Sequence, residues 1–330
     1  MKIGINGFGR IGRAVFRICD SREINIVAIN DIIKSDVAAH LLKYDSVFGK
    51  FEKNVKAGED FINVNGKIIK VTSFTEPKKI PWKEFEVDIV VESTGRFVDR
   101  ESSSGHIEAG AKKVIISAPA KKPDITIVMG VNENNYDSGK HHIISNASCT
   151  TNCFAMLVKV LHENFKIKRG ELTTIHSYTN DQRIVDSPHK DLRRARAAAM
   201  SIIPTSTGAG KAIYEIFPEL NGKLTALAIR IPTPNVSVCD FSCELEKKTS
   251  KEEINSLFKK YSEGELKNYL LYSEDPIVSV DVVKDTHSAV FDSTLTDVVD
   301  GNFAKVFAWY DNEWGYSSRI VDIIEFISKL

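Results

Sequence analysis

A glycine-rich turn between a short apolar segment and an amphipathic one is the feature that most constrains the fold of this chain. Residues 2–6 are predicted to form a buried strand, and Gly7-Phe8-Gly9-Arg10-Ile11-Gly12 follows at once, before a helical pattern of apolar residues. Gly7 permits a tight turn, Gly9 lets a pyrophosphate approach the backbone, and Gly12 lets helix and strand pack closely. We therefore expect a Rossmann-type dinucleotide-binding domain, with Arg10 and Ile11 also in the cofactor-binding loop.

A carboxylate at the end of the next predicted strand supports the same interpretation. Residues 24–29 form this strand, and Asn30-Asp31 follows it, about twenty residues beyond the glycines. At that distance Asp31 is expected to bond the ribose hydroxyls of the cofactor and to repel the additional 2′-phosphate of NADP. The predicted cofactor is therefore NAD.

Further apolar runs indicate the remaining strands of a parallel sheet. They cover residues 87–91, 114–116, 125–129 and 143–144. Thr94 and Ser117 follow two of these runs, at the carboxyl edge where open α/β sheets bind cofactors, and are candidates for cofactor binding. Spacing alone equally allows them to be ordinary loop residues.

A cysteine among small polar residues predicts covalent chemistry. In Ser145–Cys153, Cys149 precedes apolar residues at helical spacing, so it is expected at a helix N-terminus, where the positive end of the helix favours a thiolate. His176 is the candidate activator and proton carrier, and an imidazolium beside the sulfur would lower the pKa of Cys149. A lone cysteine and a lone histidine are more often buried core residues, but the polar neighbours Ser148 and Thr150 favour an anion site.

The second half of the chain is predicted to be a separate α+β catalytic domain with a largely antiparallel sheet. Its longer strands are expected at residues 171–176, 224–231, 236–245 and 304–310. A polar loop is predicted from Tyr178 to about Met200, and the C-terminal helix is expected to pack back onto the first domain. The predicted boundaries are 1–148 for the NAD-binding domain, completed by helix 313–330, and 149–312 for the catalytic domain.

Composition limits the partners and the compartment. The chain has 330 residues, a formal net charge of +0 and five cysteines, so no global field favours nucleic acid or membrane, and a disulfide framework is not indicated. The chain shows no apolar signal segment and is predicted to be cytoplasmic. No ligand spacing indicates a metal site. The basic cluster in the loop after Tyr178 leaves RNA binding open as a secondary activity only.

Six segments together resemble the phosphorylating glyceraldehyde-3-phosphate dehydrogenases of bacteria, along essentially the whole chain. They are Ile5–Arg13, Ser145–Cys153, Thr173–Gln182, Asp191–Ala198, Pro204–Gly208 and Trp309–Glu313. The resemblance implies a homotetramer that oxidises glyceraldehyde 3-phosphate with NAD and inorganic phosphate to 1,3-bisphosphoglycerate. Cys149 would form a hemithioacetal and then a thioester, with His176 as acid and base.

The same resemblance implies roles for the remaining site residues. Thr179 and Arg230 would hold one phosphate. The other phosphate would be held by Ser148, Thr150, Arg194, Thr207 and Gly208. Asn312 would bond the nicotinamide carboxamide, with Tyr316 packed nearby. Two alternatives remain: an erythrose-4-phosphate dehydrogenase, against which Thr179 and Thr207-Gly208 argue, and a Cys-His hydrolase, which would not need the glycine loop or Asp31.

Overall fold

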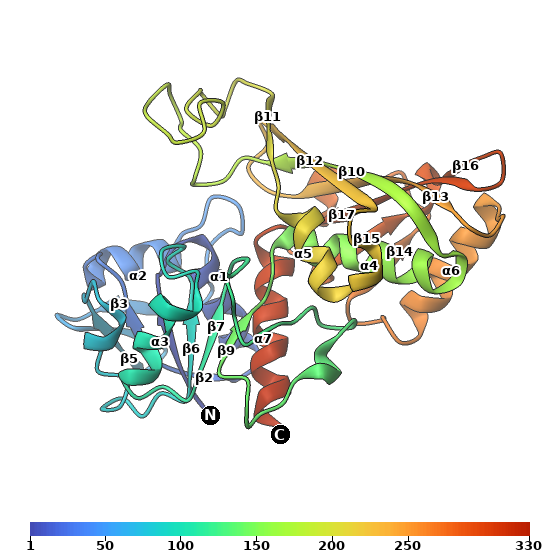
Figure 1. The fold of residues 1–330 in the computed structure, drawn as a ribbon. Helices are drawn as coiled ribbons and strands as arrows, with labels where there is room; N and C mark the ends of the chain where they lie inside the picture. The colour runs from blue at the N-terminus through green and yellow to red at the C-terminus, as the bar shows by residue number, and fades with distance from the viewer. The chain divides into compact units, whose positions relative to one another are not determined.

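The structure is a computed structural model that describes residues 1–330, and its internal contacts divide the chain into two compact units. The first unit comprises Met1–Ile127, Asn132–Ala147 and Ser317–Leu330, and the second comprises Val128–Val131 and Ser148–Tyr316. Figure 1 shows the elements of each unit. None of the helices combines the length and the apolar character that crossing a bilayer would require.

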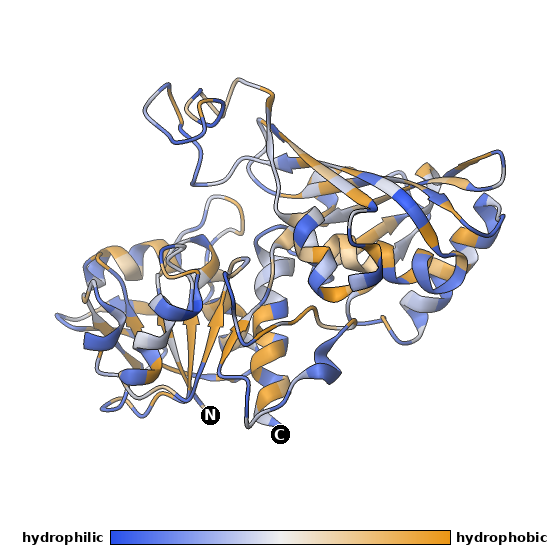
Figure 2. Cartoon of the chain, viewed as in Figure 1, coloured by the Kyte–Doolittle hydropathy of each residue, from blue (hydrophilic) through white to orange (hydrophobic).

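The first unit is built on a nine-stranded sheet with the order β3-β4-β5-β2-β1-β6-β7-β9-β8. The strands are β1 (Lys2–Asn6), β2 (Asn25–Asn30), β3 (Val55–Ala57), β4 (Phe61–Val64), β5 (Lys67–Thr72), β6 (Ile89–Glu92), β7 (Lys113–Ile116), β8 (Ile125–Thr126) and β9 (Ile143–Ser145). From β5 to β8 all neighbours are parallel, whereas β3, β4 and β5 pair antiparallel. Figure 2 shows β6 and β7 as strongly apolar, which is typical of parallel strands buried on both faces.

The helices of this unit connect the parallel strands. They are α1 (Arg10–Ser21), α2 (Ser35–Lys43), α3 (Arg100–Glu108) and the short η1 (Pro77–Lys79) and η2 (Glu133–Asn135). The C-terminal helix α7 (Trp314–Ser328) belongs to the first unit from Ser317 onward. Within this unit Arg22 donates to Asp322 at 2.6 Å and to Glu325 at 3.0 Å, which ties α7 to the end of α1.

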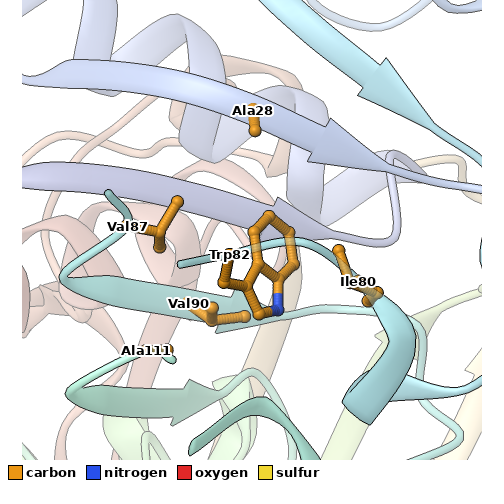
Figure 3. Close-up of a cluster of buried hydrophobic side chains, with 6 residues drawn as sticks. All are labelled: Ala28, Ile80, Trp82, Val87, Val90 and Ala111. Carbon is orange, nitrogen blue, oxygen red and sulfur yellow. The ribbon is translucent and has the colours of Figure 1, made fainter. Parts of the chain in front are cut away.

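One core cluster of the first unit surrounds Trp82 (Figure 3). The indole is fully buried and packs with small and branched side chains, which are Ala28, Ile80, Val87, Val90 and Ala111. Its Nε1 donates to Nδ1 of His106 at 2.9 Å, which satisfies the one polar atom that the ring buries. Removing a ring of this size from a closed core would cost roughly 3–5 kcal/mol of folding free energy.

The second unit contains an eight-stranded sheet whose path is β11-β12-β10-β13-β17-β15-β14, with β16 paired to β17. Its strands are β10 (Ile167–Ser177), β11 (Ile203–Ser206), β12 (Leu224–Ile231), β13 (Ser237–Leu245), β14 (Leu270–Ser273), β15 (Ala289–Asp292), β16 (Asp297–Val299) and β17 (Phe303–Tyr310). Its helices are α4 (Cys149–Phe165), α5 (Ala209–Ile216), α6 (Lys251–Glu263) and the short η3 (Pro218–Leu220), η4 (Ser279–Val282) and η5 (Ser293–Leu295). The sheet is mostly antiparallel, with parallel pairs at β10–β12 and β14–β15.

The predicted fold class is confirmed, and most of the strands predicted from apolar periodicity are present. The strand at 224–231 has the predicted bounds, and those at 171–176, 236–245 and 304–310 are extended or shortened by a few residues. The predicted strand 125–129 is wrong beyond Thr126. The Ile127 amide still donates to the Ser145 carbonyl of β9 at 2.9 Å, but the strand ends there, and Ile127 and Val128 are fully buried.

The long segment between β10 and β11 contains no helix or strand from Tyr178 to Ile202, as predicted. In Figure 1 it projects as an extended loop from these two strands. Several of its basic side chains pair within the loop: Arg194 Nη1 donates to Asp181 at 2.7 Å, and Arg196 Nε donates to Asp186 at 2.8 Å. These pairs neutralise part of the charge that could attract RNA.

Candidate active site

Cys149 is the first residue of α4, where the sequence predicted it. Ser148 is the N-cap of α4, and its Oγ accepts from the Thr151 amide at 3.0 Å, which satisfies one of the unpaired amides of the first turn. Behind Cys149 the helix buries a continuous apolar surface, with Phe154, Leu157 and Leu161 fully inaccessible. The packed helix therefore holds the cysteine rigidly.

Cys149 and His176 are in direct contact. The distance between Sγ of Cys149 and Nε2 of His176 is 3.4 Å. Cys149 comes from α4 and His176 from β10. Nδ1 of His176 lies 2.7 Å from the carbonyl oxygen of Ser177. A carbonyl can only accept, so this contact is a hydrogen bond when the ring proton is on Nδ1, and Nε2 is then free to accept a proton from the sulfur.

Arg230 is brought to this pair by the parallel ladder of β10 and β12, in which it stands opposite His176. Its Nη1 donates to the Ser177 carbonyl at 3.1 Å and lies 2.9 Å from Nδ1 of His176. Its buried Nε has no hydrogen-bond partner. An unpaired buried guanidinium nitrogen is costly, and this one is suited to an anionic ligand.

The protonation of the pair differs from the sequence-based prediction. Burial raises the pKa of the Cys149 thiol to about 11, although Arg230 and the donors of Thr150 act in the opposite direction. Burial, together with the positive charge of Arg230, lowers the pKa of His176 to about 3. The predicted lowering of the cysteine pKa is wrong, because desolvation outweighs the helix terminus and the imidazole is not charged. Burial therefore favours the uncharged thiol and the uncharged imidazole over an ion pair.

The Asn312 side chain is bonded to the end of β10, the strand that carries His176. Its Oδ1 accepts from the hydroxyls of Ser177 and Ser237, both at 2.8 Å. Ser237 Oγ already accepts the Ser177 amide at 3.1 Å, so its proton is available for the Asn312 oxygen. The side-chain amide is thereby oriented with Nδ2 as its remaining donor. Tyr316, the other predicted residue of this part, is buried.

The remaining phosphate-binding candidates lie on the loop after β10 and at the start of α5. The Thr179 amide donates to Gln182 Oε1 at 3.3 Å. Arg194 Nε donates to Thr205 Oγ1 at 3.0 Å, which anchors the loop on β11. Thr207 Oγ1 accepts from the Ala209 amide at 3.2 Å, and Gly208 is the N-cap of α5. Of the predicted phosphate ligands, Ser148, Thr150 and Arg230 adjoin the Cys149–His176 pair.

The glycine loop of the first unit has the geometry that a dinucleotide site requires. A Cβ on Gly12 would lie 2.1 Å from the carbonyl oxygen of Gly7, so only glycine allows this approach, whereas a Cβ on Gly9 would meet nothing within 4 Å. No side chain caps the N-terminus of α1, which follows Gly9 directly. Asp31 Oδ2 accepts from the Phe8 amide at 2.5 Å, so the carboxylate lies at the loop. These residues fit a dinucleotide.

The other cofactor candidates of this unit lie at the predicted sheet edge. Thr94 donates through its amide (2.8 Å) and its hydroxyl (2.5 Å) to Glu92 Oε1, and the Ser117 amide donates to the Glu92 carbonyl at 2.9 Å. Arg10 pairs with Asp45 at 2.5 Å. Ile11 is half-buried in the first turn of α1.

Sequence reasoning missed a buried polar network beneath this edge. Glu92 Oε2 accepts from Asn6 Nδ2 at 2.5 Å and contacts His106 Nε2 at 2.9 Å. Trp82 can only donate to Nδ1 of His106, so Nε2 carries the proton and donates to Glu92. The network ties β1, β6 and α3 together below the glycine loop. A glutamate ending an apolar run, Val90-Val91-Glu92, was the available signal.

All five cysteines are free, and no group of three or more His, Cys, Asp or Glu side chains is placed to hold a metal ion. Cys149 alone among the cysteines is partly exposed. A reagent that reaches thiols in the folded protein should therefore meet Cys149 first.

Comparison with known proteins agrees with both sites. Residues 1–100 match the family model for the "NAD binding domain" of glyceraldehyde 3-phosphate dehydrogenase, so the cofactor is NAD, and residues 148–312 match the model for its "C-terminal domain". The glyceraldehyde-3-phosphate dehydrogenase of Geobacillus stearothermophilus is 58% identical over 330 residues, 100% of this chain and 98% of that protein. Glyceraldehyde-3-phosphate dehydrogenase 2 of Streptomyces avermitilis is 55% identical over 331 residues (100% and 99%), and glyceraldehyde-3-phosphate dehydrogenase 1 of Bacillus subtilis is 54% identical over 330 residues (100% and 98%). The chain therefore belongs to the bacterial-type glyceraldehyde-3-phosphate dehydrogenase family.

Proposed function

We propose that this enzyme oxidises D-glyceraldehyde 3-phosphate to 1,3-bisphosphoglycerate with NAD and inorganic phosphate, and that Cys149 and His176 are its catalytic residues. The 3.4 Å contact between Sγ of Cys149 and Nε2 of His176 is the observation that carries the proposal. An unprotonated ring nitrogen beside a thiol can take the thiol proton as the sulfur attacks, which makes the sulfur a nucleophile.

In the proposed reaction Cys149 and His176 exchange one proton throughout. As Sγ bonds the aldehyde carbon, the thiol proton passes to Nε2 and then to the carbonyl oxygen, which gives a hemithioacetal. Nε2 takes the hydroxyl proton back when the carbon loses hydride, and a thioester remains on Cys149. Phosphate attack on the thioester releases the sulfur, which recovers its proton from His176.

Two anion sites beside the pair are part of the proposal. Thr179 and Arg230 hold one phosphate, and Ser148, Thr150, Arg194, Thr207 and Gly208 hold the other. The unpartnered Nε of Arg230 supports this role, since a phosphate oxygen would satisfy it. The first turn of α4 adds the positive end of the helix, which favours an anion next to Cys149.

NAD supplies the hydride acceptor when bound. We propose that its phosphates and ribose are held by the first-unit residues Gly7, Gly9, Arg10, Ile11, Gly12, Asp31, Thr94 and Ser117, and that residues 1–148 with the C-terminal helix 313–330 serve as its binding domain. Residues 149–312 are the proposed catalytic domain. Asn312 would donate from Nδ2 to the nicotinamide carboxamide, because its Oδ1 is already engaged by two serines, and Tyr316 would pack nearby.

The phosphate requirement tests the proposed reaction. NADH absorbance is followed with glyceraldehyde 3-phosphate and NAD, with and without inorganic phosphate. We expect sustained turnover with phosphate only, because the thioester otherwise stays on Cys149. Turnover independent of phosphate would indicate a hydrolytic aldehyde dehydrogenase. NADH from erythrose 4-phosphate but not from the triose would favour the sister activity.

We propose a homotetramer, on the basis of apolar side chains that the loop after β10 leaves exposed. Their exposed fractions are 81% for Ile184, 70% for Val185, 81% for Leu192, 82% for Met200 and 71% for Ile202. A surface of this kind usually meets a partner, and an identical chain is the simplest one. Light scattering should give four times the 36.8 kDa of the chain. A monomer mass at micromolar concentration would contradict the proposal.

A cytoplasmic location is also proposed, because the reaction needs Cys149 as a free thiol and a reducing compartment maintains it. Recovery of the enzyme mainly from a secreted fraction would contradict this location.

A further inference from the structure

Tyr310 joins the two elements that carry Cys149 and His176. It is the last residue of β17 and is 2% exposed. Its Oη lies 2.9 Å from Oγ1 of Thr150 and 2.8 Å from Oγ1 of Thr174. Thr150 follows Cys149 in the first turn of α4, and Thr174 lies on the same face of β10 as His176. One hydroxyl thus spans the gap between the nucleophile and its base.

The protons of these hydroxyls can be ordered. Each hydroxyl has a single proton, and Thr150, the residue after Cys149, acts to lower the pKa of that thiol. If Thr150 donates to the sulfur, it must accept from Tyr310, and Tyr310 must then accept from Thr174. The result is a chain in which Thr174 donates to Tyr310, Tyr310 to Thr150, and Thr150 to Sγ. Such chains polarise each donor in turn, and their last bond is strengthened.

The ring of Tyr310 contacts the other catalytic residue. The centroids of Tyr310 and His176 are 5.9 Å apart with an interplanar angle of 78°, an edge-to-face arrangement. Such a pair favours one orientation of the imidazole. The same side chain therefore contacts the base through its ring and the nucleophile's neighbour through its hydroxyl.

We propose that Tyr310 is a positioning residue for the thiol–imidazole pair: its hydroxyl directs the Thr174–Tyr310–Thr150 chain onto the Cys149 sulfur, and its ring fixes the plane of His176. The assignment of the pair rests on the proposed function, but the chain acts on the sulfur whether or not a substrate is present. A tyrosine that only filled the core would leave the ionisation of Cys149 unchanged.

The test is the pH dependence of Cys149 alkylation by iodoacetamide, in the wild type and in Tyr310→Phe. The substitution keeps the ring and removes the hydroxyl. Thr150 then no longer accepts from Tyr310, and its hydroxyl proton is no longer directed to the sulfur. The thiolate is then less stabilised and the pKa of the thiol rises. At any pH below that pKa a smaller fraction is ionised, and the alkylation rate is expected to fall about 3-fold to 10-fold, the effect of one lost hydrogen bond. The pH–rate profile should move to higher pH by the corresponding amount.

The control variant is Tyr214→Phe. Tyr214 is a partly buried tyrosine of the same unit, and its Oη donates to the Leu224 carbonyl, away from the pair. Its removal should leave the alkylation profile unchanged. In turnover, Tyr310→Phe should lower kcat with little change in the KM for the aldehyde, since the tyrosine does not touch the substrate in this proposal.

The far end of the chain gives a second comparison that does not depend on Tyr310→Phe folding. Thr174→Val removes the first donor, whereas Thr174→Ser keeps it, so the valine variant should alkylate more slowly and the serine variant should recover the wild-type profile. Unchanged profiles in Tyr310→Phe and Thr174→Val, with only a lower melting temperature, would overturn the proposal. Alkylation needs neither aldehyde nor NAD, so a wild type that made no NADH would refute the proposed function and leave this test standing.

Discussion

Replacing Cys149 by serine should lower kcat for NADH formation by at least about 10³-fold, because the hydroxyl is far less nucleophilic and gives no thioester. The protein should still bind NAD, since the proposed cofactor residues of the first unit are unchanged, and titration of intrinsic fluorescence with NAD checks this. Steady-state rates at saturating aldehyde and phosphate give the loss. The matched control is Cys243→Ala, a buried free cysteine in β13, which should keep most of its activity.

The labelling pattern should agree with the rates. Cys149 is partly exposed and the other four cysteines are buried, so brief iodoacetamide treatment of the folded wild type should add one label per chain and the serine variant should add almost none. A serine variant that retained more than about a tenth of the wild-type kcat would rule out Cys149 as the nucleophile.

Replacing His176 by asparagine should cost about 10²-fold to 10⁴-fold in kcat, the usual contribution of a general acid–base catalyst. Asparagine preserves much of the shape but cannot take the thiol proton or return it. The burial that raises the pKa of Cys149 to about 11 makes this proton acceptor more important, since little thiolate forms without it at neutral pH. The measurements are kcat and the alkylation rate of Cys149 as functions of pH.

The sign of the pH effect follows from the same pKa. Below it, the thiolate fraction rises about tenfold per pH unit, so raising the pH should partly restore alkylation in the asparagine variant. His162→Asn is the control, a buried histidine of α4 whose Nε2 lies 3.3 Å from Glu219. If both variants lost activity equally, the loss would reflect disturbance of the helix rather than proton transfer.

The sequence was sufficient for features that depend on neighbours along the chain. The glycine loop is strand, turn and helix within about twenty residues, and its geometry depends on single atoms such as the absent Cβ of Gly12. The start of α4 at Cys149 follows from a capping serine and a helical apolar pattern. Local patterns of this kind form the structure that they predict, because tertiary packing stabilises the same structure.

Features that depend on distant contacts could not be predicted from spacing. Tyr310 is separated from Thr150 by 160 residues and from Thr174 by 136 residues, so no local pattern joins the three hydroxyls. The pKa of Cys149 was predicted in the wrong direction because desolvation depends on how many atoms the whole unit packs around the sulfur. The resemblance identified Arg230, but its place opposite His176 results from a parallel pairing inside a mostly antiparallel sheet.

The last residues of the chain have a consequence for its synthesis. Ser317–Leu330 belong to the first unit, while the second unit is finished at Tyr316. On the ribosome the second unit can therefore fold before the first unit has all its parts, although the first unit is translated earlier. Until α7 leaves the exit tunnel, the surface that it covers stays open to chaperones and proteases. The final fourteen codons thus decide when the NAD-binding unit becomes complete, and a chain that stops before them should be degraded from its N-terminal unit.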